Sequence, residues 1–193
     1  MRKSQPAVPV RPAPYEVERK RYTGVAGTVK HMVTFIRDGQ TRGEVRDYAL
    51  DTIKNVYPHA TTSEIAALYF DLCRRLRYTR DPANAEMLHQ PQITLQNRAG
   101  DCDDMAVALG AATQAAVGKR LQYQGSAGVA AASVGAPVEV VTVGFTGPKG
   151  EHTHTFVRTW DSQTAQWLVM DPVAGPLTSN MIRRVTNYKT WSV

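Results

Sequence analysis

Cysteine is scarce in this chain of 193 residues, which has only Cys73 and Cys102. Two cysteines are too few for the disulfide framework of a small secreted domain, and neither stands in the cysteine and histidine spacing of a zinc site. A glycine-rich loop of the kind that binds phosphate is also missing. We therefore expect no cofactor and no metal ion.

Long apolar runs are absent as well. None approaches the about 20 residues that a membrane-spanning helix needs. Residues 1–14 are basic and rich in proline, and they contain no apolar segment like that of a signal peptide. These absences predict synthesis in a cytoplasm, with no signal peptide and no membrane span. The net charge of +6 is dispersed and no nucleic-acid recognition motif accompanies it, so we expect no nucleic-acid partner.

The patterns that are present predict helices first and strands later. Apolar residues recur at helical spacing in residues 28–37, 44–56 and 61–76, and from Cys102 to about Val117. Residues 83–98 are expected to be irregular, because Pro91 excludes a regular helix. Residues 138–145, 154–160 and 166–170 have strand patterns, and the last two form a hairpin. The expected fold class is α+β, with N-terminal helices and the helix of Cys102 packed on a small antiparallel sheet.

Three regions are predicted along the chain. Residues 1–22 form an extended, basic, proline-rich arm that tethers the protein to a partner. Residues 23–173 form one domain, with a helical part at 23–120, a loop of small residues at 121–137 and the sheet at 138–173. Residues 174–193 form a basic C-terminal tail that docks on the core or on a partner.

The chemistry centres on Cys102, which follows a glycine turn and begins a helix. Free N–H groups at a helix N-terminus and a nearby imidazolium lower the pKa of a thiol. The neighbouring carboxylates of Asp101, Asp103 and Asp104 act in the opposite direction and raise that pKa. We assign these carboxylates to capping the helix. The alternatives are that these carboxylates form a divalent-metal site, or that Asp103 or Asp104 pairs with an arginine such as Arg98.

Two residues on later elements can complete a catalytic group. His154 begins one strand and Asp171 directly follows the next, and the start of the first strand in a hairpin lies beside the end of the second. His152 lies on the same face and is the alternative base, but His154 begins the apolar alternation. A thiol, an imidazole and a carboxylate can act as nucleophile, base and orienting group. The other histidines are expected at the surface: His31, His59 and His89.

The three motifs read Gly100-Asp101-Cys102-Asp103-Asp104, His154-Thr155-Phe156-Val157-Arg158, and Trp167-Leu168-Val169-Met170-Asp171-Pro172. In this order they resemble the motifs of the transglutaminase-like superfamily, part of the wider papain-like group of cysteine enzymes. The resemblance covers about residues 60–173. It implies that Cys102 is the nucleophile, His154 the base and Asp171 the orienting acid.

The oxyanion of an acyl-transfer reaction needs hydrogen-bond donors. The backbone N–H of Cys102 is one candidate donor. The side chain of Gln92 or of Gln96 is the candidate for a second.

Residues 77–82, 92–95 and 100–104 are also similar to small transglutaminase-like proteins of tailed bacteriophages and prophages. This resemblance implies a virion component of the tail tip or baseplate, made in the host cytoplasm, with protein partners bound through the arm and the tail. We expect a cysteine-dependent amide or peptide hydrolase that acts on peptides or peptidoglycan-like substrates of the host cell wall. The alternatives are a structural or assembly protein of the virion with an idle triad, and a transamidase that cross-links proteins.

Overall fold

The protein is described by a computed structural model. The described residues are 24–56, 61–82, 87–123, 137–147, 150–161, 163–174 and 185–193. The arm predicted at residues 1–22 lies outside these ranges, as do residues 124–136 of the predicted loop. No helix in the described ranges is long and apolar enough to cross a membrane.

The described helices and strands confirm the α+β expectation. The helices are α1 (Val25–Gly39), α2 (Gly43–Ile53), α3 (Thr61–Arg75), α4 (Pro91–Asn97) and α5 (Cys102–Tyr123). The short strands β1 (Arg77–Tyr78) and β2 (Ala99–Gly100) pair in parallel. The main sheet contains β3 (Val138–Gly147), β4 (Gly150–Asp161), β5 (Gln166–Met170) and β6 (Val185–Ser192). It is antiparallel, with the strand order β5-β4-β3-β6.

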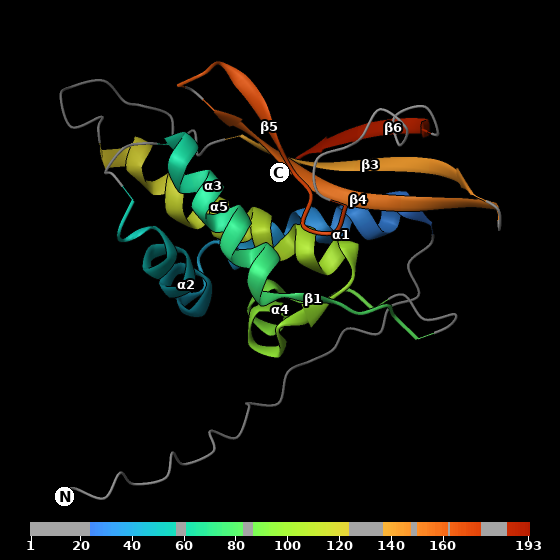
Figure 1. The fold of residues 1–193 in the computed structure, drawn as a ribbon, viewed down its shortest axis with the longest axis horizontal. Coiled ribbons are helices and arrows are strands. Elements are labelled where there is room, and N and C mark those ends of the chain that lie inside the picture. Colours follow the sequence, from blue (N-terminus) through green and yellow to red (C-terminus); the bar gives the residue numbers. More distant parts are fainter. Residues whose placement is uncertain are drawn as a thin grey trace, which may run out of the picture.

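Helix α5 forms the centre of the core. It contacts the four other helices and one face of the sheet, and Figure 1 shows the sheet lying along one side of the helices. Residues 103–117 of α5 are buried all round, which suits a helix made largely of alanine and other small residues. A Cβ atom on Gly110 would lie 2.9 Å from Cδ1 of Ile36, so this glycine lets α1 approach α5 closely.

Helix α4 corrects the prediction that residues 83–98 are irregular. Pro91 does not exclude this helix, because it occupies the first turn, where its missing N–H has no intrahelical partner in any case. The helix ends at Arg98, a non-glycine residue with a φ of 53°. Its N–H donates to the carbonyl of Thr94 and closes the last turn.

The C-terminal segment adds a strand that its sequence did not predict. Strand β6 pairs with β3 over most of its length, and Trp191, opposite Val140, packs against the core. The rest of β6 is mostly exposed and polar, so it lacks the apolar alternation by which a strand is recognised. The second half of the predicted tail therefore docks on the core.

Strand β5 is shorter than β4, and this difference in length leaves part of one edge of β4 unpaired. Pairing between the two strands runs from Asp161 opposite Gln166 to Val157 opposite Met170, where β5 ends. The N-terminal part of β4 therefore has an edge that β5 does not cover. The beginning of α5 lies at this edge.

Candidate active site

His154 and Asp171 meet where β5 ends. Nε2 of His154 lies 2.7 Å from Oδ2 of Asp171, and both side chains are largely buried. A carboxylate accepts hydrogen bonds, so Nε2 of the imidazole carries the proton and Nδ1 is left as the basic nitrogen. The predicted hairpin geometry thus brings these two residues together. The side chain of His152, the alternative base, lies outside the described part of the structure.

The Asp171 carboxylate is held from two sides. Its Oδ2 faces His154, while Oδ1 accepts the backbone N–H groups of Val173 at 3.0 Å and Ala174 at 2.9 Å. The hydroxyl of Tyr69, from α3, donates to the backbone carbonyl of Asp171 at 3.0 Å. These contacts leave the carboxylate one orientation in which every partner is satisfied.

Aromatic rings flank the imidazole of His154. The ring of Phe156 lies 5.9 Å from it and that of Phe145 lies 6.5 Å from it, measured between centroids. Both phenylalanines are buried, and they belong to an apolar cluster with Val141 and Val143. The imidazole therefore has an apolar wall on one side and the carboxylate on another.

The Cys102 thiol lies against the uncovered edge of β4. The backbone N–H of Trp160 donates to the carbonyl of Pro137, on the side of β4 that faces β3. Successive N–H groups along a strand point to alternate edges, so the N–H of Thr155 points toward the other edge, the one that β5 does not cover. There it donates to the sulfur of Cys102, a contact that lowers the pKa of the thiol. Thr155 is the neighbour of His154 in the chain. The thiol and the imidazole are thus carried by adjacent parts of the structure.

The balance of effects on the thiol is unfavourable to a resting thiolate. Burial raises the pKa of Cys102 to about 12, and the charges of Asp101 and Asp103 add to the increase. The hydrogen bond from the N–H of Thr155 lowers this pKa, but by less than burial and the two charges raise it. The lowering expected from a helix N-terminus is therefore outweighed, and the predicted opposition from the carboxylates has the correct sign.

The glycine of the Gly-x-Cys motif has a packing reason. A Cβ atom on Gly100 would lie 2.6 Å from Cβ of Asp104 and 2.9 Å from its Oδ2. Any larger side chain at this position would displace Asp104 from the first turn of α5. The backbone N–H of Asp104 in turn donates to Oδ1 of Asp103 at 2.9 Å.

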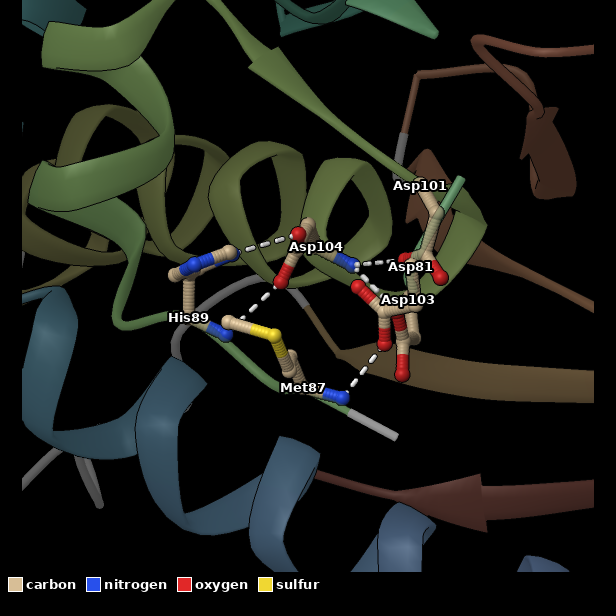
Figure 2. A network of polar contacts seen from close by, with 6 residues as sticks. All are labelled: Asp81, Met87, His89, Asp101, Asp103 and Asp104. Carbon is tan, nitrogen blue, oxygen red and sulfur yellow. Dashed lines mark hydrogen bonds and ion pairs between the residues drawn. The ribbon is translucent and has the colours of Figure 1, made fainter. Parts of the chain in front are cut away.

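Asp104 corrects the prediction for His89. It pairs with His89, and Figure 2 shows the two side chains facing each other at the beginning of α5. The alternative pairing of Asp103 with an arginine such as Arg98 stays a prediction. His89 is consequently a half-buried residue of the site region and not a surface histidine. No sequence signal marks it, because the two partners stand fifteen positions apart on segments of different type.

The predicted oxyanion donors have different surroundings. Gln96 is exposed near the end of α4, whereas Gln92 is buried and its Nε2 donates to Oε1 of Gln90 at 2.6 Å. Their role at an oxyanion stays a prediction. Tyr78, which no sequence motif marks as a site residue, lies opposite Gly100 in the β1–β2 pair. Burial raises the pKa of Tyr78, and its electrostatic interaction with Cys102 adds to the increase.

Within the described ranges, one group of side chains has the arrangement of metal ligands. Asp101, Asp103 and Asp104 each offer an oxygen atom, and these atoms lie within 4.8 Å of one another. Carboxylate oxygens suit hard cations such as Ca²⁺ and Mg²⁺. Asp104 also pairs with His89, so the cluster is part of the hydrogen-bonded structure of this turn.

No family model and no curated protein matches the sequence. Similar solved structures include a candidate cysteine protease from Cytophaga hutchinsonii and LapG from Legionella pneumophila, each 12% identical in sequence. The first alignment covers 82% of this chain and 55% of the other, with a TM-score of 0.47. The second covers 84% and 87%, with a TM-score of 0.48. This chain therefore spans about half the length of the Cytophaga protein.

Proposed function

We propose that the protein is a cysteine-dependent amide or peptide hydrolase, with Cys102 as nucleophile, His154 as base and Asp171 as the group that orients the base. The observation that carries this proposal is the hydrogen bond of 2.7 Å between Nε2 of His154 and Asp171. It leaves Nδ1 free for the proton of a thiol that belongs to the neighbouring helix start. A thiol, an imidazole and a carboxylate are the groups that serve as nucleophile, base and orienting group in acyl-transfer enzymes, which supports the proposal.

The raised pKa of Cys102 indicates how the reaction begins. Because the thiol is neutral at rest, Nδ1 of His154 takes its proton as the sulfur attacks the carbonyl carbon. The resulting imidazolium donates to Asp171 through Nε2 and gives its other proton to the leaving amine. A thioester on Cys102 remains, and water activated by the same imidazole releases the acid and restores the thiol.

A fluorogenic peptide library of aminomethylcoumarin amides tests this assignment. Cys102→Ala is expected to abolish turnover, whereas Cys73→Ala removes the other thiol, on α3, and keeps it. Intact-mass analysis during turnover is expected to show an acyl adduct on the wild type that hydroxylamine removes. Turnover by Cys102→Ala at the wild-type rate would exclude the proposed nucleophile.

A hydrolase and a transamidase differ in the molecule that accepts the acyl group from the Cys102 thioester, which is water in the first and an amine in the second. Both reactions use the same three residues, so the same assay is run with monodansylcadaverine as an added amine. We propose water as the acceptor, and release of free acid without dansyl incorporation is the expected result. The peptidoglycan-like substrate, the phage tail location and the partners of the arm and tail stay predictions from the resemblance.

A further inference from the structure

His89 and Asp104 form a second imidazole–carboxylate pair beside the one at the proposed active site. The backbone N–H of His89 donates to Oδ1 of Asp104 at 2.7 Å, and Nδ1–H of the same residue donates to Oδ2, also at 2.7 Å. Asp104 is only 1% exposed. One residue therefore satisfies both oxygens of a carboxylate that has almost no access to water (Figure 2).

This pair and the thiol lie on opposite sides of one helical turn. Cys102 and Asp104 are two positions apart in α5, which corresponds to about 200° of rotation around the helix axis. On one side the sulfur of Cys102 accepts the N–H of Thr155 from β4. On the other side Asp104 is held by His89. Hydrogen bonds from Thr155 and from His89 thus hold the first turn of α5 on both sides.

Asp104 is coupled to the turn that carries the thiol. Its side chain packs directly over Gly100, so closely that even a methyl group at that position would clash with it. Its backbone N–H is accepted by the side chain of Asp103. A movement of the Asp104 carboxylate therefore displaces residues 100–104 together, and the position of Sγ with them.

The segment that carries His89 is itself fixed. The N–H of Met87 donates to the carboxylate of Asp81, which follows β1, and Gln90 directly precedes α4. In Figure 2, Asp104 lies between His89 on one side and Asp81 on the other. His89 is therefore attached to two anchored elements and can act as a rigid support for Asp104.

We propose that His89 is a positioning residue for the nucleophile: by holding both oxygens of Asp104, it fixes the rotation of the first turn of α5 and so the place of the Cys102 sulfur at the edge of β4. The proposal rests on the proposed function, because a thiol needs such positioning only if it reacts together with the imidazole of His154. His89 itself does not contact the reacting atoms. Its effect passes through Asp104.

Two substitutions of His89 distinguish a role of its hydrogen bond to Asp104 from a role of its side-chain packing alone. His89→Leu removes the ring donor, whereas the amide of His89→Asn places an N–H where Nδ1–H of the imidazole was. His89→Leu is expected to lower kcat by about 10- to 100-fold with little change in KM, as for a reacting group displaced by about 1 Å. His89→Asn is expected to restore kcat to within about threefold of the wild type, since the bond to Asp104 is kept.

Alkylation of Cys102 by iodoacetamide, in a Cys73→Ser background, gives a readout that needs no substrate. His89→Leu is expected to change the rate constant at pH 8 by about tenfold or more, because the sulfur leaves its position against Thr155. His89→Asn should match the wild type. Tyr48→Phe is the matched control, since it also removes a hydrogen bond to a buried aspartate, Asp71, but between helices α2 and α3.

The outcomes are distinguishable. Wild-type alkylation and kcat in His89→Leu would overturn the positioning role, and so would a His89→Asn variant as impaired as His89→Leu. If His89→Leu does not fold, His89→Asn is compared with Asp104→Asn instead. The first variant should have the kcat and the alkylation rate of the wild type, and the second should not. A wild type without turnover would refute the proposed function, while the alkylation rates would still decide the role of His89.

Discussion

Replacing Asp171 by asparagine tests the orientation of the proposed base. Cysteine enzymes can use an amide in this position when its oxygen accepts Nε2–H of the histidine. Here the other carboxylate oxygen, Oδ1, already accepts two backbone N–H groups, from Val173 and Ala174. An asparagine has only one oxygen, so it cannot serve both these groups and His154.

The side-chain amide of the Asp171→Asn variant can take two orientations, and these have different costs. If the amide oxygen takes the place of Oδ1, the amide N–H faces Nε2 of His154. The imidazole must then carry its own proton on Nδ1, so Nδ1 can no longer accept the proton of the thiol. If the amide is turned over, two part-buried backbone N–H donors lose their acceptor, at about 1–3 kcal/mol each. The active orientation is therefore disfavoured by about 2–6 kcal/mol, and at 1.4 kcal/mol per factor of ten kcat falls by about 30-fold to more than 10⁴-fold.

The tautomer can be observed directly. Nitrogen-15 spectra of the histidine rings, with His154→Gln for assignment, should show the proton on Nε2 in the wild type and on Nδ1 in Asp171→Asn. Tyr69→Phe is the control, because it removes the bond to the backbone carbonyl of Asp171 and a contact with Cys73 but leaves the Asp171 carboxylate in place, so the tautomer should be unchanged. An Asp171→Asn variant that keeps the proton on Nε2 and loses less than about threefold in kcat would refute this account of the site.

Two further predictions concern the thiol and the core. Because the pKa of Cys102 is raised to about 12, its alkylation in a background without the other cysteine should rise with pH without a plateau up to about pH 10. Asp101→Asn removes a negative charge, which favours the thiolate, so it should lower this pKa and speed alkylation at pH 8 by about two- to tenfold; an unchanged pH profile would contradict the electrostatic argument. In the core, a Cβ on Gly39 would lie 2.3 Å from Cγ of Pro91, so Gly39→Ala should lower the free energy of unfolding in urea by about 1–3 kcal/mol. Gly43→Ala, whose Cβ would meet nothing within 4 Å, should not lower it.

The parts of the site that lie on regular elements were predictable from the sequence. A period of two along residues 154–160 places His154 on the face of the hairpin on which Asp171 also lies. The structure has these two side chains in contact. Likewise the apolar run after Cys102 predicts the helix that the structure shows. Local periodicity carries this information because the chain geometry of a strand or helix leaves few other arrangements.

Contacts between distant segments were not predictable in this way. The pairing of His89 with Asp104 depends on how the segment before α4 lies against the start of α5, and His89 has no periodic context that would indicate it. Pro91 misled for a different reason, since the same residue breaks a helix in its interior and begins one in its first turn. Burial, which dominates the pKa of Cys102, is likewise a property of the packed structure.

The length of β5 ties these observations together. If β5 extended two residues further, its backbone would pair with the N–H of Thr155, and the sulfur of Cys102 would have no place at that edge of β4. Ending β5 at Met170 also puts Asp171 at the first position outside the strand, where its side chain can accept backbone N–H groups and Nε2–H of His154. A single strand end thus opens the edge for the thiol and supplies the carboxylate. The burial that results raises the pKa of the thiol, so the proposed chemistry requires a base that takes the proton as the sulfur attacks, rather than a thiolate formed in advance.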